Sequence, residues 1–176
     1  MKILGIDPGT ATTGYGVIKA KRGSDKLICL DYGCINTSPA VDPCKRLKQI
    51  EKGVNKLIRR FSPRVLAVEK LYFFKNSKTI VSVSQAKGVI LLAAAKKKVP
   101  VVEFTPLEVK MAITGYGRAK KIQMQKMIQV LLGLRELPKP DDAADALALA
   151  VCAHLMLFSK LSPFKQKVLT GRWRKI

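Results

Sequence analysis

The chain has 176 residues, 48% of them hydrophobic, so it is long enough and apolar enough to fold as one domain around its own core. Its 33 Lys and Arg residues outnumber its 12 Asp and Glu residues, which gives a formal net charge of +21. Such a charge indicates nucleic acid as the partner, although an anionic membrane or an acidic protein would also attract it. Charge therefore indicates the class of partner and not the chemistry.

Composition also argues against export and membrane insertion. Residues 1–10 lack the apolar core of a secretory signal, and the uncharged stretch at 146–159 is shorter than the roughly 18 to 20 apolar residues that span a bilayer. We therefore expect a cytoplasmic protein with no membrane partner. The cysteines form no CxxC pair, which disfavours zinc sites and disulfides and predicts reduced core thiols: Cys29, Cys34, Cys44 and Cys152.

Apolar runs predict three antiparallel strands at the start of the chain. Residues 2–7 are mainly apolar and stop at Asp7, before a turn-forming Pro-Gly pair. Residues 14–20 and 26–37 are rich in β-forming side chains, and a turn-type segment lies between them. The first strand is predicted to be buried in the middle of a sheet and to end in a carboxylate.

The next two elements are predicted to be a helix and a strand that also ends in an acid. From Pro43 to Phe61, apolar residues recur every three or four positions with Lys and Arg between them, which is typical of an amphipathic helix with a basic outer face. Residues 64–69 form a second apolar run that ends at Glu69. If this strand lies beside the first, Glu69 comes close to Asp7.

An aromatic and basic loop at 71–78 precedes a helix predicted at about 79–98. This helix is apolar around much of its circumference, so it needs two packing partners, and a second subunit is one candidate. Residues 100–105 predict a fifth strand, and helical turns follow from Leu107.

Two further helices complete the predicted fold. The first, at 120–134, is expected to point five apolar side chains inward and three lysines outward. The inward set is Ile122, Met127, Ile128, Leu131 and Leu132, and the outward set is Lys120, Lys121 and Lys126. The second, at 141–158, opens with aspartates. Together the elements predict an α/β domain at 1–159, with a five-stranded mixed sheet flanked by helices, and a basic, flexible C-terminal tail at 160–176.

Four of the 12 acidic residues are placed at two predicted strand ends and in one turn at the start of a predicted helix. Asp7 and Glu69 close two strands, whereas Asp142 and Asp145 are three residues apart in a helix, which puts them on one face. Grouped carboxylates can hold Mg²⁺, and two such ions about 4 Å apart can clamp an in-line phosphoryl displacement. The pattern indicates a metal-dependent nuclease site.

Each acid also has an ordinary structural interpretation. Asp141, Asp142 and Asp145 lie where acids commonly cap a helix and offset its dipole. Asp7 is compatible with a turn before Pro-Gly, and Glu69 with a solvated strand end. The residues alone leave these alternatives open.

Four segments resemble the RuvC family of Holliday junction resolvases in their order and spacing: LGIDPGTATTGYGVI at 4–18, VEKLYFFKNSKT at 68–79, SQAKG at 84–88 and DDAADALALA at 141–150. The resemblance implies a ribonuclease-H-like fold and a homodimer that makes paired symmetric nicks in four-way DNA junctions with Mg²⁺, leaving 5′-phosphate and 3′-hydroxyl ends. It also implies a role in homologous recombination and DNA repair, with a branch-migration complex of the RuvA and RuvB type as partner.

The resemblance implies that four acids form the catalytic metal site. Asp7 in GIDPGT and Glu69 in AVEKLYF match the two strand carboxylates of the family, and Asp145 in AADAL matches its helix aspartate. Asp142 occupies a position that is an acid in some relatives and a histidine in others, so it is expected to be the fourth ligand and Asp141 the helix cap. The site is implied to hold two Mg²⁺ ions per subunit, with Mn²⁺ as an alternative.

Basic and aromatic residues are implied to contact the DNA. Lys110 and Lys121 match two family lysines near the scissile phosphate, and Lys121 is expected to act in catalysis. Tyr72 matches a junction-contacting aromatic that is usually Phe, and this departure leaves the identity of the wedge open. The other expected contacts are Phe73, Phe74, Lys75, Lys78 and Lys120. The alternatives are a solvated basic face and an aromatic plug under the loop.

Three other functions share parts of this pattern. Actin-like kinases and chaperones bind ATP with a similar Asp and Gly-Thr turn, but they need two lobes and this chain is long enough for one. A YqgF-like nuclease has the same fold and RNA as its expected substrate, but the aromatic loop and the apolar helix favour RuvC. The high positive charge alone would suffice for a DNA-binding protein without catalytic activity. The grouped acids argue against that function. His154 is assigned no chemical role.

Overall fold

The computed structural model describes residues 1–21, 26–71 and 77–158, with only the backbone described at 77–79 and 157–158. Five strands form one sheet in the order β3-β2-β1-β4-β5. The strands are β1 (Lys2–Asp7), β2 (Thr12–Ala20), β3 (Leu27–Asn36), β4 (Val65–Glu69) and β5 (Val101–Phe104). The helices are α1 (Pro43–Phe61), α2 (Ser77–Lys96), α3 (Pro106–Thr114), α4 (Lys121–Leu132) and α5 (Asp141–Phe158). β1 pairs antiparallel with β2 and parallel with β4, so the predicted mixed sheet is confirmed.

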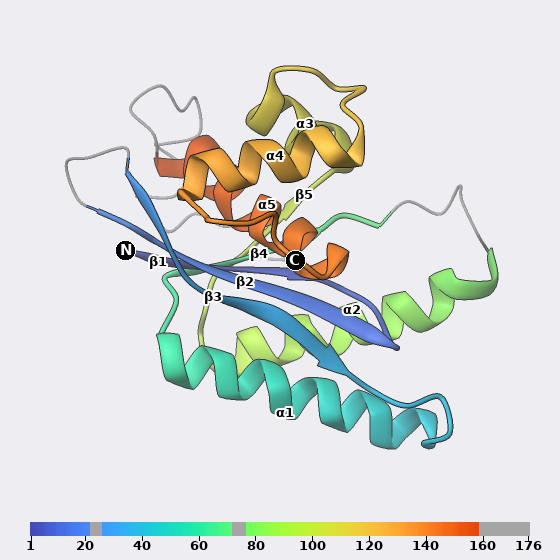
Figure 1. Ribbon diagram of the computed structural model, residues 1–176. Coiled ribbons are helices and arrows are strands. Elements are labelled where there is room, and N and C mark those ends of the chain that lie inside the picture. The colour runs from blue at the N-terminus through green and yellow to red at the C-terminus, as the bar shows by residue number, and fades with distance from the viewer. Residues whose placement is uncertain (22–25, 72–76, 159–176) are drawn as a thin grey trace.

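Helices cover both faces of the sheet, with α1 and α2 below it and α3, α4 and α5 above it in Figure 1. Each face has its own core because successive side chains of a strand point to opposite sides. In β1, Ile3 belongs to the core under α5, whereas Leu4 belongs to the core under α1 and α2. Asp7 is in phase with Ile3, so its side chain points to the α5 face.

α1 begins and ends where the sequence predicts. Asp42 precedes it and accepts a hydrogen bond from the backbone amide of Lys45 at 3.1 Å, and Pro43 occupies the first turn. The helix ends at Ser62, which adopts a left-handed conformation with φ 46°. Its apolar face packs on the sheet, so its basic face is left to solvent.

α5 lies directly on the backbone of β1 and β2. A Cβ at Gly5 would clash with the carbonyl oxygen of Ala146 and lie 2.8 Å from the amide nitrogen of Ala150. A Cβ at Gly16, which pairs with Gly5 across the strands, would lie 2.7 Å from the amide nitrogen of Leu147. Any larger residue at these two positions would push α5 off the sheet.

A third glycine places the first turn of α5. A Cβ at Gly14 would clash with the carbonyl oxygen of Asp142 and lie 3.0 Å from its Cβ. Gly14 is the partner of Asp7 in the ladder between β1 and β2. The acidic start of α5 is therefore held beside the carboxylate that ends β1.

The buried face of α4 differs from the predicted one. Ile122 is 46% exposed, whereas Met124, which was not in the predicted inward set, is only 8% exposed. The buried residues are Met124, Ile128 and Leu132, four residues apart. Apolar residues occur on more than one side of this helix, so their periodicity could not select the face that α3 and α5 cover.

The predicted core position of the cysteines is wrong for Cys44, which is exposed in the first turn of α1. Cys152 is buried, Cys29 and Cys34 are partly buried, and all four are free thiols. Among the helices in the described part of the chain, none combines the length and apolar character needed to cross a membrane. The predicted tail at 160–176 lies outside the described residues.

We expect Gly5→Ala to lower the free energy of unfolding by about 1 to 3 kcal/mol, because the added methyl group would displace α5 from β1. Urea denaturation followed by circular dichroism measures the change. Lys56→Ala in α1 is the control, since this exposed helical side chain lies outside the core, and it should be close to neutral. Equal destabilisation by both substitutions would contradict the close packing of α5.

Candidate active site

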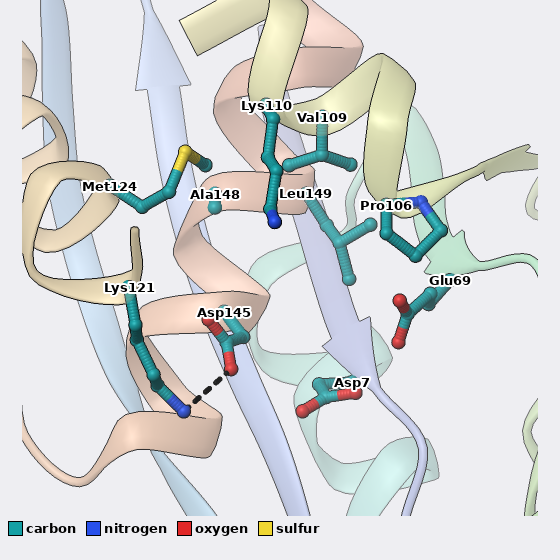
Figure 2. A pocket seen from close by; sticks show the side chains of 10 residues that line it. All are labelled: Asp7, Glu69, Pro106, Val109, Lys110, Lys121, Met124, Asp145, Ala148 and Leu149. Atoms are coloured by element: carbon teal, nitrogen blue, oxygen red, sulfur yellow. Dashed lines mark ion pairs between the residues drawn. The ribbon is translucent and has the colours of Figure 1, made fainter. Parts of the chain in front are cut away.

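Two acids meet at one edge of the sheet because β1 and β4 run parallel. Ile6 pairs with Val68, so the residues that follow them, Asp7 and Glu69, are neighbours at the carboxyl ends of the two strands. Both side chains lie in the same pocket in Figure 2. The proximity that the sequence predicted for this pair is present in the fold.

The pocket is a cavity of about 280 Å³ bounded by the strand ends and by α3, α4 and α5. Asp7, Glu69 and Asp145 contribute carboxylates to it, while Lys110 and Lys121 contribute ammonium groups (Figure 2). These five residues come from five different elements. The rest of the lining is mainly apolar: Pro106, Val109, Met124, Ala148 and Leu149.

The surroundings of the pocket carboxylates disfavour their ionised form. Burial raises the pKa of Asp7 to about 8, and the next largest cause is the charge of Glu69. Burial is also the main cause that raises the pKa values of Glu69 and Asp145. The charge of Lys87, whose Nζ donates to Glu103 at 2.8 Å, opposes the rise at Glu69. Full ionisation of the group is disfavoured in the metal-free protein, because the protein compensates its negative charge only in part.

Lys121 is shared between two acids of α5. Its Nζ lies 3.2 Å from Oδ2 of Asp145 and 3.2 Å from Oδ2 of Asp141. Burial lowers the pKa of Lys121, but the charge of Asp145 and the hydrogen bonds to both acids raise it overall. Lys121 therefore stays charged at the edge of the pocket.

Asp141 links α5 to α4, which differs from the expected cap. Besides its contact with Lys121, its Oδ1 accepts a hydrogen bond from Nε2 of Gln125 at 2.9 Å. At the start of α5, the backbone amides of Ala143 and Ala144 donate to the carbonyl oxygen of Pro140, at 3.0 Å and 3.2 Å. Asp141 is not among the residues that line the pocket.

Asp142 lies close to the pocket without lining it. Its charge contributes to the raised pKa values of Asp7 and Asp145, so it belongs to the same electrostatic group. Its backbone carbonyl rests against Gly14. Of the four predicted acids, Asp7, Glu69 and Asp145 therefore line the cavity, and Asp142 lies at its margin.

The predicted DNA-contacting residues fall into two sets. Lys110 and Lys121 line the pocket, whereas Lys120 is exposed at the start of α4 and lies outside the lining. The side chains of the remaining five lie outside the described residues: Tyr72, Phe73, Phe74, Lys75 and Lys78. Their proposed roles therefore stay predictions.

Sequence reasoning missed the residues that position the acids. Gly5, Gly14 and Gly16 allow α5 to approach the strands, and isolated glycines inside strand patterns are the signal that could have found them. Thr13 is fully buried, and its Oγ1 donates to the carbonyl of Gly9 at 2.6 Å, which holds the turn after Asp7.

The donor set of the pocket fits Mg²⁺ bound in an open site. Within the residues that the structure describes, no three acidic, His or Cys side chains form a closed cluster of metal ligands. Mg²⁺ is usually held by one or two carboxylates together with water and substrate phosphates, and it does not require a cage made of protein alone. Oxygen donors, incomplete charge compensation and an open cavity meet that requirement.

The model of the family described as crossover junction endodeoxyribonuclease RuvC matches residues 3–154 of the chain. The chain belongs to the RuvC family. It is 54% identical over 167 residues to the crossover junction endodeoxyribonuclease RuvC of Moorella thermoacetica, covering 95% of this chain and 96% of that relative. Identity to the RuvC of Syntrophomonas wolfei is 49%, over 99% of both chains.

Solved RuvC structures share the fold. Thermus thermophilus RuvC superposes with a TM-score of 0.83 at 35% identity, over 88% of this chain and 94% of that one. A structure of the same RuvC in complex with a Holliday junction substrate gives a TM-score of 0.83 at 36% identity, over 88% of this chain and 93% of that one. The predicted ribonuclease-H-like fold is therefore confirmed.

We expect Asp7→Asn to make the metal-free protein less sensitive to pH. Folding raises the pKa of Asp7 from 3.8 to about 8, so between these values the folded state binds more protons and Asp7 lowers stability as pH rises. Melting temperatures in EDTA between about pH 5 and about pH 8 should fall less steeply for Asp7→Asn than for the wild type.

Glu136→Gln is the control, because it removes an exposed acid outside the pocket and should keep the wild-type slope. A wild-type slope in Asp7→Asn would contradict the placement of Asp7 among buried like charges.

Proposed function

We propose that this chain is a structure-specific endodeoxyribonuclease that resolves four-way DNA junctions by paired symmetric nicks, in homologous recombination and DNA repair. The observation that carries the proposal is the joint placement of Asp7, Glu69 and Asp145 with two lysines in one pocket of a RuvC family fold. Thermus thermophilus RuvC, which shares that fold at 36% identity, is known in complex with a Holliday junction substrate.

Asp7, Glu69, Asp145 and Asp142 would hold the metal in this proposal. Their oxygen donors suit Mg²⁺, two ions per subunit are proposed, and Mn²⁺ would substitute because it accepts the same ligands. When bound, the metal supplies Lewis-acid activation of water and neutralises charge on the phosphate.

The side chains of the pocket contribute orientation and charge. Asp7 and Glu69 end two hydrogen-bonded strands, which restricts how far their carboxylates can move. Lys121, held by Asp145 and Asp141, and Lys110 on α3 present ammonium groups that can stabilise negative charge developing on a phosphate. The apolar part of the lining strengthens these interactions by limiting access of water.

Residues around the pocket are proposed to hold the junction. Lys120, Lys75 and Lys78 would contact phosphates together with Lys110 and Lys121. Bases at the branch point would stack on three aromatic side chains, Tyr72, Phe73 and Phe74. These roles rest on the position of the residues in the family motif.

We also propose that α2 forms a homodimer interface. An exposed stripe follows this helix at alternating spacings of four and three residues, as in helices that pack against a copy of themselves. The stripe consists of Val81, Gln85, Gly88, Leu92 and Ala95. Val81 is 63% exposed and Leu92 is 51% exposed, and nothing covers a Cβ at Gly88. Two copies would supply the two active sites that paired nicks require.

Family membership supports two further parts of the proposal. A branch-migration complex of the RuvA and RuvB type would deliver the junction, and the cytoplasm would be the site of action. Residues 1–159 would form the nuclease domain.

The activity is tested by incubating the protein with a mobile four-way junction, a linear duplex and an RNA–DNA hybrid, each with Mg²⁺ or EDTA. We expect paired nicks that are confined to the junction and require Mg²⁺. Asp7→Asn should abolish cleavage and keep junction binding, because phosphate contacts with basic residues supply most of the affinity. Glu136→Gln should cleave normally. Wild-type cleavage by Asp7→Asn, or equal cutting of the linear duplex, would contradict the proposal.

The dimer is tested with Leu92→Glu, which would bury a charge in the proposed interface and should give a monomer. Sedimentation velocity at concentrations where the wild type is a dimer measures the change, and paired nicking of junctions should be lost with it. Val130→Glu on α4, where the side chain is 73% exposed, is the control and should remain a dimer. A dimeric Leu92→Glu protein would contradict the assignment of this interface.

A further inference from the structure

A second hollow lies between α1 and the C-terminal end of α2, below the sheet and therefore on the face opposite the active site (Figure 1). We call it the α1–α2 groove. Its volume is about 360 Å³. Its lining consists of Lys48, Glu51, Lys52, Asn55 and Arg59 from α1, with Lys96 and Lys97 at the end of α2.

The α1–α2 groove carries an excess of positive charge. Five of its seven lining residues are cations and one is an acid, an excess of four charges. That acid, Glu51, already accepts a hydrogen bond from Nζ of Lys96 at 2.8 Å. Lys48 and Lys52 are four residues apart on one helix, where like charges repel and lower stability. Such an excess is explained by a polyanionic ligand.

The cations on α1 form a row that suits a phosphate backbone. Lys48, Lys52 and Arg59 lie on one side of the helix, and a rise of 1.5 Å per residue makes the row about 16 Å long. Phosphates of one DNA strand advance by about 3.4 Å along the duplex axis, so the row corresponds to about four or five of them. The lysines at the end of α2 form the second wall.

The middle of the groove contains a polar group without a partner. The Oδ1 atom of Asn55 is buried and accepts no hydrogen bond from any described residue. This oxygen can only accept, so its missing partner is a donor such as a water or an ammonium group, whereas the amide nitrogen of Asn55 is the atom that can donate to a phosphate oxygen.

We propose that the α1–α2 groove binds the phosphate backbone of a duplex DNA segment other than the one in the active site. The two sites lie on opposite faces of the sheet, and DNA has a persistence length of about 150 base pairs, so bending one short duplex around the domain to reach both would cost deformation energy that a second segment avoids. The inference rests on the proposed function in taking DNA as the polyanion.

The chemistry of the groove favours DNA over an acidic protein. Protein interfaces are usually anchored by aromatic or other apolar side chains in their centre. The lining of the groove contains no aromatic and no aliphatic hydrophobic residue. Charge without an apolar anchor is the pattern of sequence-independent backbone binding.

The test compares a groove variant, Lys48→Gln/Lys52→Gln, with a control, Lys19→Gln/Lys21→Gln. The control removes the same charge from exposed lysines that do not line the groove. Affinity for a linear duplex of about 20 base pairs is measured by fluorescence anisotropy over a range of salt concentrations. The groove variant should bind roughly tenfold more weakly at moderate salt, and the slope of log K against log salt should decrease by about 2, while the control changes little.

Lysine footprinting of the wild-type protein gives a readout that does not depend on the variant's folding. Acetylation of Lys96 and Lys97 should be reduced when the linear duplex is added to protein already saturated with a four-way junction. Unchanged acetylation, together with equal duplex affinity in both variants, would overturn the proposal. Protection by polyglutamate and not by duplex would overturn it in favour of an acidic protein partner.

Junction cleavage separates the two proposals. At saturating protein, the groove variant should cut the junction at the wild-type rate, because the groove is remote from the pocket. If the wild type cuts no junction, the proposed function fails, while duplex binding still tests the groove. If junctions are cut normally and the groove variant binds duplex as the control does, the groove proposal alone fails.

Discussion

The contact of α5 with the bare backbone of β1 and β2 is the constraint on which the active site depends. Three glycines remove the side chains that would otherwise separate the helix from the strands, and the closest approaches are to Ala146, Asp142 and Leu147. Because Gly14 is paired with Asp7, the same contact that packs the core places the start of α5 beside the end of β1. Packing and the arrangement of the acids are therefore one structural feature.

This arrangement concentrates negative charge in a chain whose net charge is +21. Burial raises the pKa of Asp7, and Lys121 compensates only part of the charge of its neighbours. The metal-free pocket is thus electrostatically strained, and a divalent cation with a phosphate relieves that strain. The other face of the sheet has a different character, since α1 and α2 present a cationic groove and an exposed, uncharged stripe there. With the proposed dimer and the proposed groove, the sheet would separate the active site from the dimer interface and from the second DNA contact.

Much of the fold could be predicted from periodicity, because the strands and helices have clear apolar patterns and α1 begins and ends at the expected residues. The pairing of Asp7 with Glu69 followed from two apolar strands that each end in an acid. The buried face of α4 could not be predicted, since the choice between Ile122 and Met124 depends on which helices cover it. The role of Asp141 depends on Lys121 and Gln125, which are distant in sequence. The junction as substrate came from the family motifs and not from the physical chemistry of single residues.

The central claim is that Asp7 and its neighbouring carboxylates form a metal site whose negative charge is only partly compensated. Calorimetric titration with Mg²⁺ near neutral pH, in two buffers of different ionisation enthalpy, tests it directly because it measures metal binding and proton release together. Since the pKa of metal-free Asp7 is about 8, binding should release protons from the carboxylate group, roughly one per site. Asp7→Asn should lose most of the binding and the proton release. Binding of Mg²⁺ without proton release, or unchanged binding in Asp7→Asn, would contradict the account.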